Sequence, residues 1–150
     1  TVATPLAALL DHADALCRRR GARLTVQRRQ VLGIVWGAQG PLGAYEILGA
    51  LRAVVPGAAP PTVYRALEFL IEQGLVHRLE TLHAFVGCAH PDEPHAGQFL
   101  ICRSCGAVRE LEDPLVSRSV LAAADATGFR AERPVVEVSG RCARCARDAR

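Results

Sequence analysis

Two short cysteine pairs constrain this chain more than any other feature of its sequence. Cys102 and Cys105 are separated by two residues, and so are Cys142 and Cys145, with a predicted helix and strand between the pairs. Two intervening residues form a tight turn that directs both thiolates at one point, and two such turns complete a tetrahedron of sulfur around zinc. Because four sulfur ligands leave no open coordination position, the pattern predicts a structural zinc site rather than a catalytic one.

Other uses of these cysteines stay open on the residues alone. Either pair could act as a redox dithiol, both could oxidise in a thiol switch, and four thiolates also suit a [2Fe–2S] cluster. The sequence has no apolar run long enough to span a bilayer and no signal-peptide pattern, so we expect a cytoplasmic protein. That reducing compartment favours metal binding, whereas in a secreted protein the six cysteines could form three disulfides.

The first half of the chain predicts helices followed by a hairpin. Apolar residues recur at helical spacing in four segments that end at glycines, namely residues 4–21, 25–40, 44–57 and 60–74. Thr25 and Thr62 are expected to cap the second and fourth helices, and Cys17 is expected to be a small buried hydrophobe. Period-two alternation then runs from residue 75 to 86. This order predicts a winged helix-turn-helix, whose last helix enters the DNA major groove.

The second half of the chain predicts a small α/β domain. A polar stretch rich in Pro and His, residues 89–97, marks the boundary, and strands are expected at 98–102, 107–111 and 129–142 around a helix at 114–127. An open sheet edge could pair with a second copy of the chain. We therefore expect an α+β protein with three segments: a winged-helix DNA-binding domain at 1–84, a linker at 85–97 and an α/β dimerisation domain at 98–150.

The basic excess of the chain lies in its first half, where we expect DNA binding, and we expect no small-molecule substrate. Residues 1–82 hold nine arginines against six acidic residues, while residues 83–150 hold nine against nine. Every basic residue is arginine, which suits bidentate contact with phosphate or guanine, although a GC-rich genome would give the same enrichment. Arg65 lies on the outer face predicted for the fourth helix, so it is a candidate base contact, with a solvated helix arginine as the alternative.

A second group of metal-binding residue types is scattered in the sequence. His77, Cys88, His95 and Glu110 would make a tetrahedral set of sulfur, nitrogen and oxygen ligands that suits zinc, although surface histidines are commoner than ligands. His77 belongs to the predicted DNA-binding half and Glu110 to the other half, so a shared metal would set the angle between the domains. No HExxH helix and no HxE with a PCxxC partner occurs, so we expect no enzyme activity.

Three runs of residues resemble the ferric uptake regulator family over nearly the whole chain. They are Pro61-Thr-Val-Tyr-Arg-Ala-Leu67, Gly74-Leu-Val-His77 and the two Cys-x-x-Cys pairs. Within that family, the segment Glu72–His77 together with Cys88 and His95 is most similar to the zinc uptake regulator branch. The resemblance implies a zinc-responsive repressor that dimerises and binds palindromic operator DNA when regulatory zinc is bound, controlling zinc uptake genes.

The resemblance also implies ligand sets and DNA contacts. It assigns two zinc ions to each subunit, a structural one and a regulatory one. The ligands of the structural zinc are Cys102, Cys105, Cys142 and Cys145. The ligands of the regulatory zinc are His77, Cys88, His95 and Glu110. His83 and His90 could form a weaker third site, and His90 could replace His95. The candidate DNA contacts are Tyr45, Thr62, Tyr64 and Arg65. Iron, manganese or peroxide sensing within the same family, or a redox-switched zinc-binding module, remain alternatives.

Overall fold

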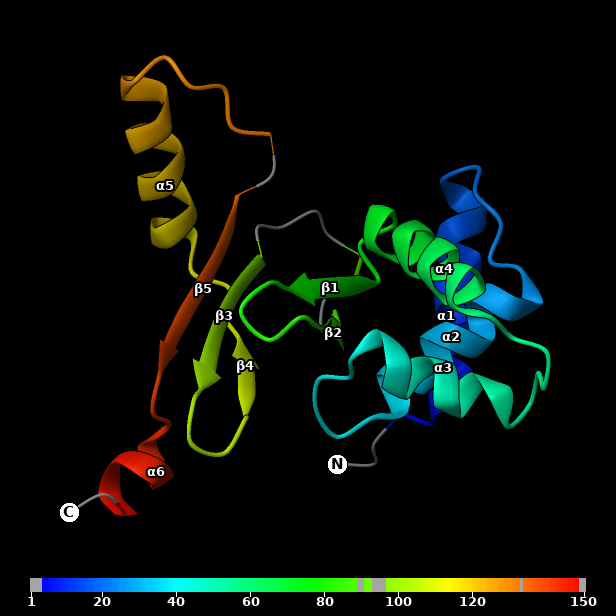
Figure 1. Cartoon of the computed structure of the whole chain (residues 1–150). Helices are drawn as coiled ribbons and strands as arrows, with labels where there is room; N and C mark the ends of the chain where they lie inside the picture. The colour runs from blue at the N-terminus through cyan, green and yellow to red at the C-terminus, as the bar shows by residue number, and fades with distance from the viewer. Residues whose placement is uncertain (1–3, 89–90, 93–96, 133, 149–150) are drawn as a thin grey trace. The chain divides into compact units, whose positions relative to one another are not determined.

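The chain folds into two compact units, residues 1–93 and 94–150. The structure is a computed structural model, and it describes residues 4–88, 91–92, 97–132 and 134–148. The first unit is mainly helical and the second is built on a short sheet (Figure 1). None of the described helices is long and apolar enough to cross a membrane.

The first unit contains four helices and then a two-stranded hairpin (Figure 1). Its elements are α1 (Leu6–Arg19), α2 (Val26–Gly37), α3 (Ala44–Arg52), α4 (Pro60–Glu72), β1 (Val76–Leu79) and β2 (Ala84–Gly87). This order confirms the predicted winged helix-turn-helix, with α4 as the last helix before the wing.

Local sequence explains where two of these helices begin. The Thr25 hydroxyl accepts a hydrogen bond from the Arg28 amide at 3.3 Å, which confirms the expected cap of α2. The expectation that Thr62 caps α4 is wrong, because the helix begins at Pro60 and Thr62 lies in its first turn. Proline at the first helical position has a preset φ and no amide hydrogen to satisfy, so α4 starts without a side-chain cap.

The helices enclose one apolar core. Helices α3 and α4 bury apolar residues that recur at helical spacing, as the sequence pattern predicts, and they are Ile47, Leu48, Leu51, Val63, Ala66, Leu67 and Leu70. Cys17 is fully buried in this same core, as expected for a small hydrophobe. The core therefore holds α4 rigidly by its inner face and leaves the opposite face to solvent.

The wing is fixed to the helical layer at both of its strands. Strands β1 and β2 pair antiparallel with His77 opposite Val86. Leu42 forms a bridge to Phe85 with reciprocal main-chain hydrogen bonds of 3.0 and 2.8 Å on the other side of β2. Strand β2 runs to Gly87, so the wing extends into the segment 85–97 that the sequence assigned to the linker.

The second unit is a three-stranded sheet with two helices. Its elements are β3 (Gly97–Cys102), β4 (Val108–Glu110), α5 (Pro114–Ala126), β5 (Val135–Gly140) and α6 (Ala143–Asp148). The strand order is β4-β3-β5, with β3 antiparallel to β4 and parallel to β5. The strand predicted at 129–142 is shorter than expected, since β5 starts after Pro134, and the short helix α6 was not anticipated.

A buried glutamine joins this sheet to α5. Gln98 on β3 donates from Nε2 to the Asp113 carbonyl oxygen at 2.9 Å and to the Ser117 hydroxyl at 2.8 Å. Its Oε1 accepts from the Asp113 amide at 3.1 Å, so the polar side chain is fully used. These bonds position the first turn of α5 against β3.

The α2 cap gives a direct test of the helical layer. Thr25→Ala removes the acceptor for the Arg28 amide and is expected to cost about 1 kcal/mol of unfolding free energy in the first unit. Thr25→Ser keeps the hydroxyl and is the matched control, expected to stay near the wild-type value. Chemical denaturation followed by circular dichroism measures both, and equal stabilities for the two variants would contradict the assignment.

Candidate metal centres

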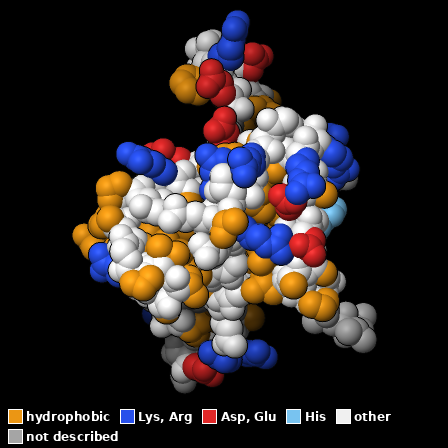
Figure 2. Space-filling view, turned by 90° about the vertical axis from the view of Figure 1, so that its right-hand side faces the viewer, with side chains coloured by type: hydrophobic (Ala, Val, Ile, Leu, Met, Phe, Trp, Pro, Cys, Tyr) orange, Lys and Arg blue, Asp and Glu red, His pale blue; other side chains and the backbone are white. Residues whose placement is uncertain are grey.

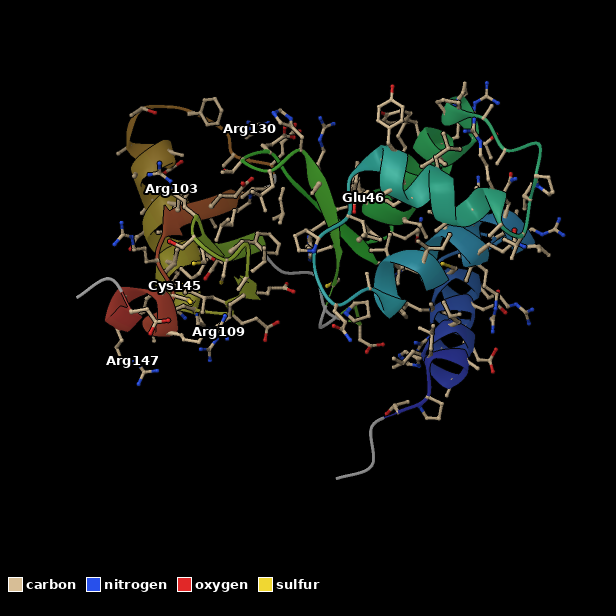
Figure 3. The ribbon with its side chains drawn as sticks, turned by 60° about the horizontal axis from the view of Figure 1, so that its bottom comes forward. Glu46, Arg103, Arg109, Arg130, Cys145 and Arg147 are labelled. Carbon is tan, nitrogen blue, oxygen red and sulfur yellow. The ribbon has the colours of Figure 1, made fainter. Side chains whose placement is uncertain are left out.

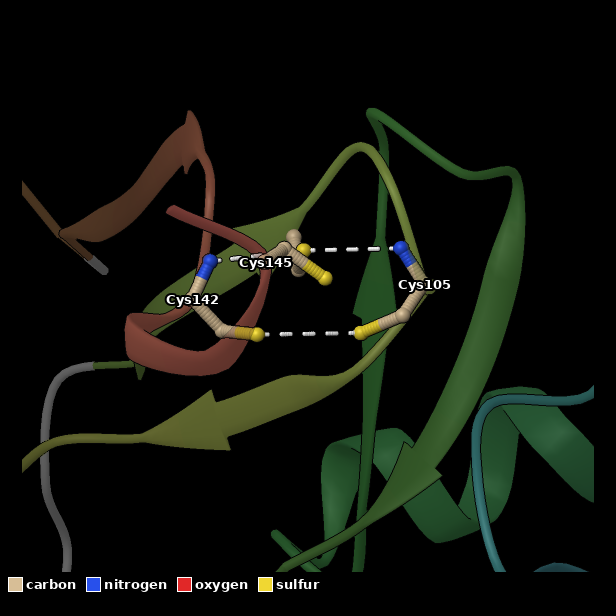
Figure 4. Close-up of side chains that lie close together, drawn as sticks. Cys105, Cys142 and Cys145 are labelled. Atoms are coloured by element: carbon tan, nitrogen blue, oxygen red, sulfur yellow. Dashed lines mark hydrogen bonds between the residues drawn. The ribbon is translucent and has the colours of Figure 1, made fainter. Parts of the chain in front are cut away.

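The two cysteine pairs meet at one end of the second unit's sheet (Figure 4). Cys102 ends β3, and the parallel register places it opposite Gly140 at the end of β5, two residues before Cys142. The Arg103 amide donates to the Gly140 carbonyl oxygen at 2.8 Å and fixes this junction. Parallel pairing therefore explains how two cysteine pairs that are distant in sequence converge, because β3 and β5 terminate at the same end of the sheet.

The four sulfur atoms have the spacing of a tetrahedral metal site. All four Sγ atoms of Cys102, Cys105, Cys142 and Cys145 lie within 4.8 Å of one another. The Cys105 and Cys142 sulfurs are 3.9 Å apart, and a zinc–sulfur bond of about 2.3 Å gives tetrahedron edges of about 3.8 Å. Gly106, at φ +77°, makes the turn that closes the first pair. The donor set and geometry thus fit a closed zinc site.

Main-chain amides prepare Cys102 to bind a metal. Its sulfur accepts hydrogen bonds from the Cys142 amide at 3.3 Å and the Cys105 amide at 3.5 Å. These bonds favour the thiolate and lower the pKa of Cys102 to about 5. Hydrogen bonding with neighbouring cysteine side chains, Cys142 first, raises the pKa of Cys145 to about 12. Four thiolates so close together need a dication to offset their charge.

Arginines adjoin both cysteine pairs in the sequence. Arg103 directly follows Cys102, Arg141 precedes Cys142, and Arg144 precedes Cys145. A zinc ion with four thiolates carries a net charge of about −2, and guanidinium groups nearby reduce the cost of holding it. Arg147 is also anchored by its own helix, since its Nε donates to the Ala143 carbonyl oxygen at 3.2 Å.

A second pair of ligand-type side chains lies on the wing of the first unit. His77 is on β1, and Cys88 directly follows β2. Their ligand atoms lie within 4.8 Å of each other, and Cys88 is only 7% exposed. The hairpin register explains the approach, because the Cys88 amide donates to the Leu75 carbonyl oxygen at 3.0 Å, two residues before His77. An imidazole and a thiolate side by side suit zinc.

The other predicted ligands belong to the second unit, to the wing turn or to residues outside the described ranges. Glu110 ends β4 in the second unit, where it pairs with Phe99 and is half-buried. His83 is exposed in the wing turn with φ +48°. His90 and His95 fall among the residues that the structure does not describe.

The predicted DNA contacts lie on α3 and α4 of the helical unit. Tyr64 and Arg65 are exposed on α4, and Thr62 is half-buried in its first turn. Tyr45 on α3 is 83% exposed, which is unusual for an aromatic side chain. Figure 2 shows arginine side chains spread over the face seen there, among acidic, apolar and uncharged groups. Glu46, labelled in Figure 3, caps α3 by accepting from the Gly43 amide at 3.2 Å.

One feature beside Cys88 escaped the sequence analysis. Trp36, near the end of α2, donates from its indole nitrogen to the Leu75 carbonyl oxygen at 3.0 Å, the same oxygen that accepts from Cys88. The only signal in the sequence is that this is the sole tryptophan of the chain. The hydrogen bond depends on tertiary structure and has no local pattern.

The four-cysteine site yields a stoichiometric test. Cys142→Ser is expected to lower the zinc content by about one ion per subunit and to destabilise the second unit, because three sulfurs do not complete the tetrahedron. Cys17→Ser is the matched control, since Cys17 is buried and belongs to no ligand cluster among the described residues, so this variant should keep the full zinc content. Elemental analysis after dialysis measures both. Unchanged zinc in Cys142→Ser would contradict the site.

Comparison with known proteins gives one consistent result. The sequence profile of the ferric uptake regulator family matches residues 19–139. The zinc uptake regulation protein of Escherichia coli K12 is 42% identical over 138 residues, covering 91% of this chain and 81% of that protein. A solved structure described as a zinc uptake regulator complexed with zinc and DNA is 40% identical, with a TM-score of 0.92 and coverage of 98% and 99%. The structure of holo XcZur is 43% identical, with a TM-score of 0.86 and coverage of 93% and 98%. The two-unit fold, the cysteine cluster and these matches agree, and the chain belongs to the ferric uptake regulator family.

Proposed function

We propose that this chain is a zinc-responsive transcriptional repressor that binds palindromic operator DNA as a homodimer when regulatory zinc is bound, and so controls zinc uptake genes. The observation that carries the proposal is that one chain holds two separate groups of zinc-type ligands, a closed four-sulfur cluster and a histidine–cysteine pair on the wing. The similarity to proteins described as zinc uptake regulators supports zinc as the signal. We place the protein in the cytoplasm, where its six free cysteines would stay reduced.

The two groups of ligands would have different roles, one structural and one regulatory. A zinc ion at the four cysteines is coordinatively saturated and would be structural, holding the end of β3 to the start of α6. A second zinc would be regulatory and would take His77 and Cys88 with His95 and Glu110. This makes two zinc ions per subunit. Whether His90 replaces His95, and whether His83 and His90 hold a third ion, stay predictions.

The regulatory zinc would act by restricting the arrangement of the domains. We assign DNA binding to residues 1–84, the linker to 85–97, whose first three residues complete strand β2 of the wing, and dimerisation to 98–150. His77 and Cys88 stand before the linker's central stretch and Glu110 stands after it, so one ion holding all of them would limit the positions the DNA-binding domains can take. Apparent DNA affinity scales with the fraction of protein in the competent arrangement. Zinc would raise that fraction.

Dimerisation would use the second unit. Strand β5 lies at an edge of the sheet, with Val135 and Val138 at least half exposed, and Phe129, six residues before the strand, is 66% exposed. Helix α5 buries none of its residues within the chain and exposes Leu115 and Leu121. An unpaired strand edge beside apolar side chains suits a second copy related by a twofold axis. The twofold would set two α4 helices in successive major grooves, about 34 Å apart.

Base reading would come from α4 with help from α3. Arg65 is exposed on α4, and its guanidinium can donate two parallel hydrogen bonds to guanine O6 and N7. Thr62 and Tyr64 on the same helix, and Tyr45 on α3, would contact the neighbouring bases or phosphates. Tyr45 and Tyr64 are exposed aromatic groups with a hydroxyl, which suits a polar interface.

Zinc-dependent operator binding is the main test. Binding to operator DNA is expected to rise with buffered free zinc in the wild type, to be lost in Cys88→Ser, and to persist in Cys17→Ser. Fluorescence anisotropy at fixed salt measures it, with ferrous and manganous ions in parallel. Binding that ignores both chelation and Cys88→Ser would overturn the regulatory site, and a response to iron or manganese alone would assign another metal. Loss of binding on mild peroxide with structural zinc released would favour the redox-switched module.

Arg65 has its own test of sequence reading. Arg65→Ala is expected to weaken operator binding by roughly 1–3 kcal/mol and to relax discrimination at one base position. Arg19→Ala is the charge-matched control on α1, and at most it should lower affinity equally for all sequences. Binding to an operator and to single-base variants separates the two effects. Equal losses on every sequence for Arg65→Ala would make it a phosphate contact only.

A further inference from the structure

The main chain of Leu75 connects the wing, α2 and the end of α4 through hydrogen bonds. The Leu75 carbonyl oxygen accepts from the Cys88 amide at 3.0 Å and from the indole nitrogen of Trp36 at 3.0 Å. The Leu75 amide donates to the Leu70 carbonyl oxygen at 2.9 Å, at the point where Gly74 ends α4 with φ +72°. Leu75 itself is fully buried. Leu75 is therefore held by three hydrogen bonds, one from its amide and two to its carbonyl oxygen.

The indole ring also touches the strand that carries Cys88. A Cβ atom added at Gly87 would clash with Trp36 Cδ1 and lie 2.9 Å from Nε1, so glycine is required for the ring to sit there. Gly87 directly precedes Cys88 in the chain. Trp36 therefore bears on Cys88 in two ways, through the shared Leu75 oxygen and through direct packing on its neighbour.

We propose that Trp36 is a positioning residue for the regulatory zinc site, setting the place of the Cys88 thiolate relative to His77. The proposal rests on the proposed function, since it assumes that Cys88 and His77 bind zinc. The indole nitrogen donates to the carbonyl oxygen of Leu75, two residues before His77. The indole ring lies against Gly87, which directly precedes Cys88. Outer contacts that orient ligands commonly govern metal affinity by 10–100-fold.

The same contact makes Trp36 a link between the zinc site and the recognition helix. Trp36 belongs to α2, which packs on α4 through the common core, while Leu75 is bonded to the last turn of α4. A zinc ion that tightens the His77–Cys88 pair would act on a peptide already joined to both helices. Because Trp36 is the only tryptophan, its fluorescence reports on this point of the chain alone.

Cobalt substitution tests the assignment on the whole protein. The structural site is kept loaded with zinc, the regulatory site is filled with Co²⁺, and the sulfur-to-cobalt charge-transfer absorption reports the Cys88–metal bond. Trp36→Phe and Gly87→Ala are expected to weaken or shift this band and to lower zinc affinity about tenfold in chelator competition. Wild-type tryptophan emission should change on zinc loading, and this change should vanish in Cys88→Ser.

A matched variant separates positioning from loss of stability. Val31→Ala removes packing from the fully buried core of the same helix, so it should lower the unfolding temperature while leaving the cobalt band and zinc affinity at wild-type values. Wild-type bands and affinities in both Trp36→Phe and Gly87→Ala would overturn the role of Trp36. A wild-type protein without any band that depends on Cys88 would instead overturn the regulatory site itself, so the two failures are distinguishable.

Discussion

In the second unit, four cysteine sulfur atoms are held at one point. Among its described residues, the buried side chains all lie on β3, and they are Gln98, Phe99, Ile101 and Cys102. So few buried groups cannot stabilise a free-standing domain of this size. The thiolates gather because parallel β3 and β5 end together and because two amides donate to Cys102. A zinc ion there would supply the folding free energy that the small core lacks.

The first unit, in contrast, is stabilised by a large apolar core. Its core is built from four helices and needs no metal, so α4 is rigid whether or not zinc is present. Its ligand-type residues sit instead on the wing, beside one buried peptide bonded to α2 and α4. A metal-controlled DNA-binding protein requires a stable recognition helix next to a segment that responds to the metal. In the proposed function, zinc would change where the helix is presented and leave its structure alone.

Elements governed by local patterns were predicted well. The inner faces of α3 and α4, the Thr25 cap, the hairpin and the buried Cys17 all follow from periodicity or from residue type, and the structure confirms them. The cap of α4 was assigned wrongly because Thr62 and Pro60 are both start signals two residues apart. The strand at 129–142 was predicted too long, because apolar alternation does not reveal that pairing begins only at Val135.

By itself, the sequence determined the helical layer, the wing and the donor types of both ligand groups, because periodicity and cysteine spacing act over a few residues. Tertiary structure alone decided that the two cysteine pairs meet, since this needs the parallel register of β3 and β5. It also decided that Trp36 and Cys88 both donate to the Leu75 carbonyl oxygen, because no sequence pattern relates the position of Trp36 to those of Leu75 and Cys88. The physical reason is that ligand chemistry belongs to side chains, whereas ligand geometry depends on main-chain pairing between distant segments.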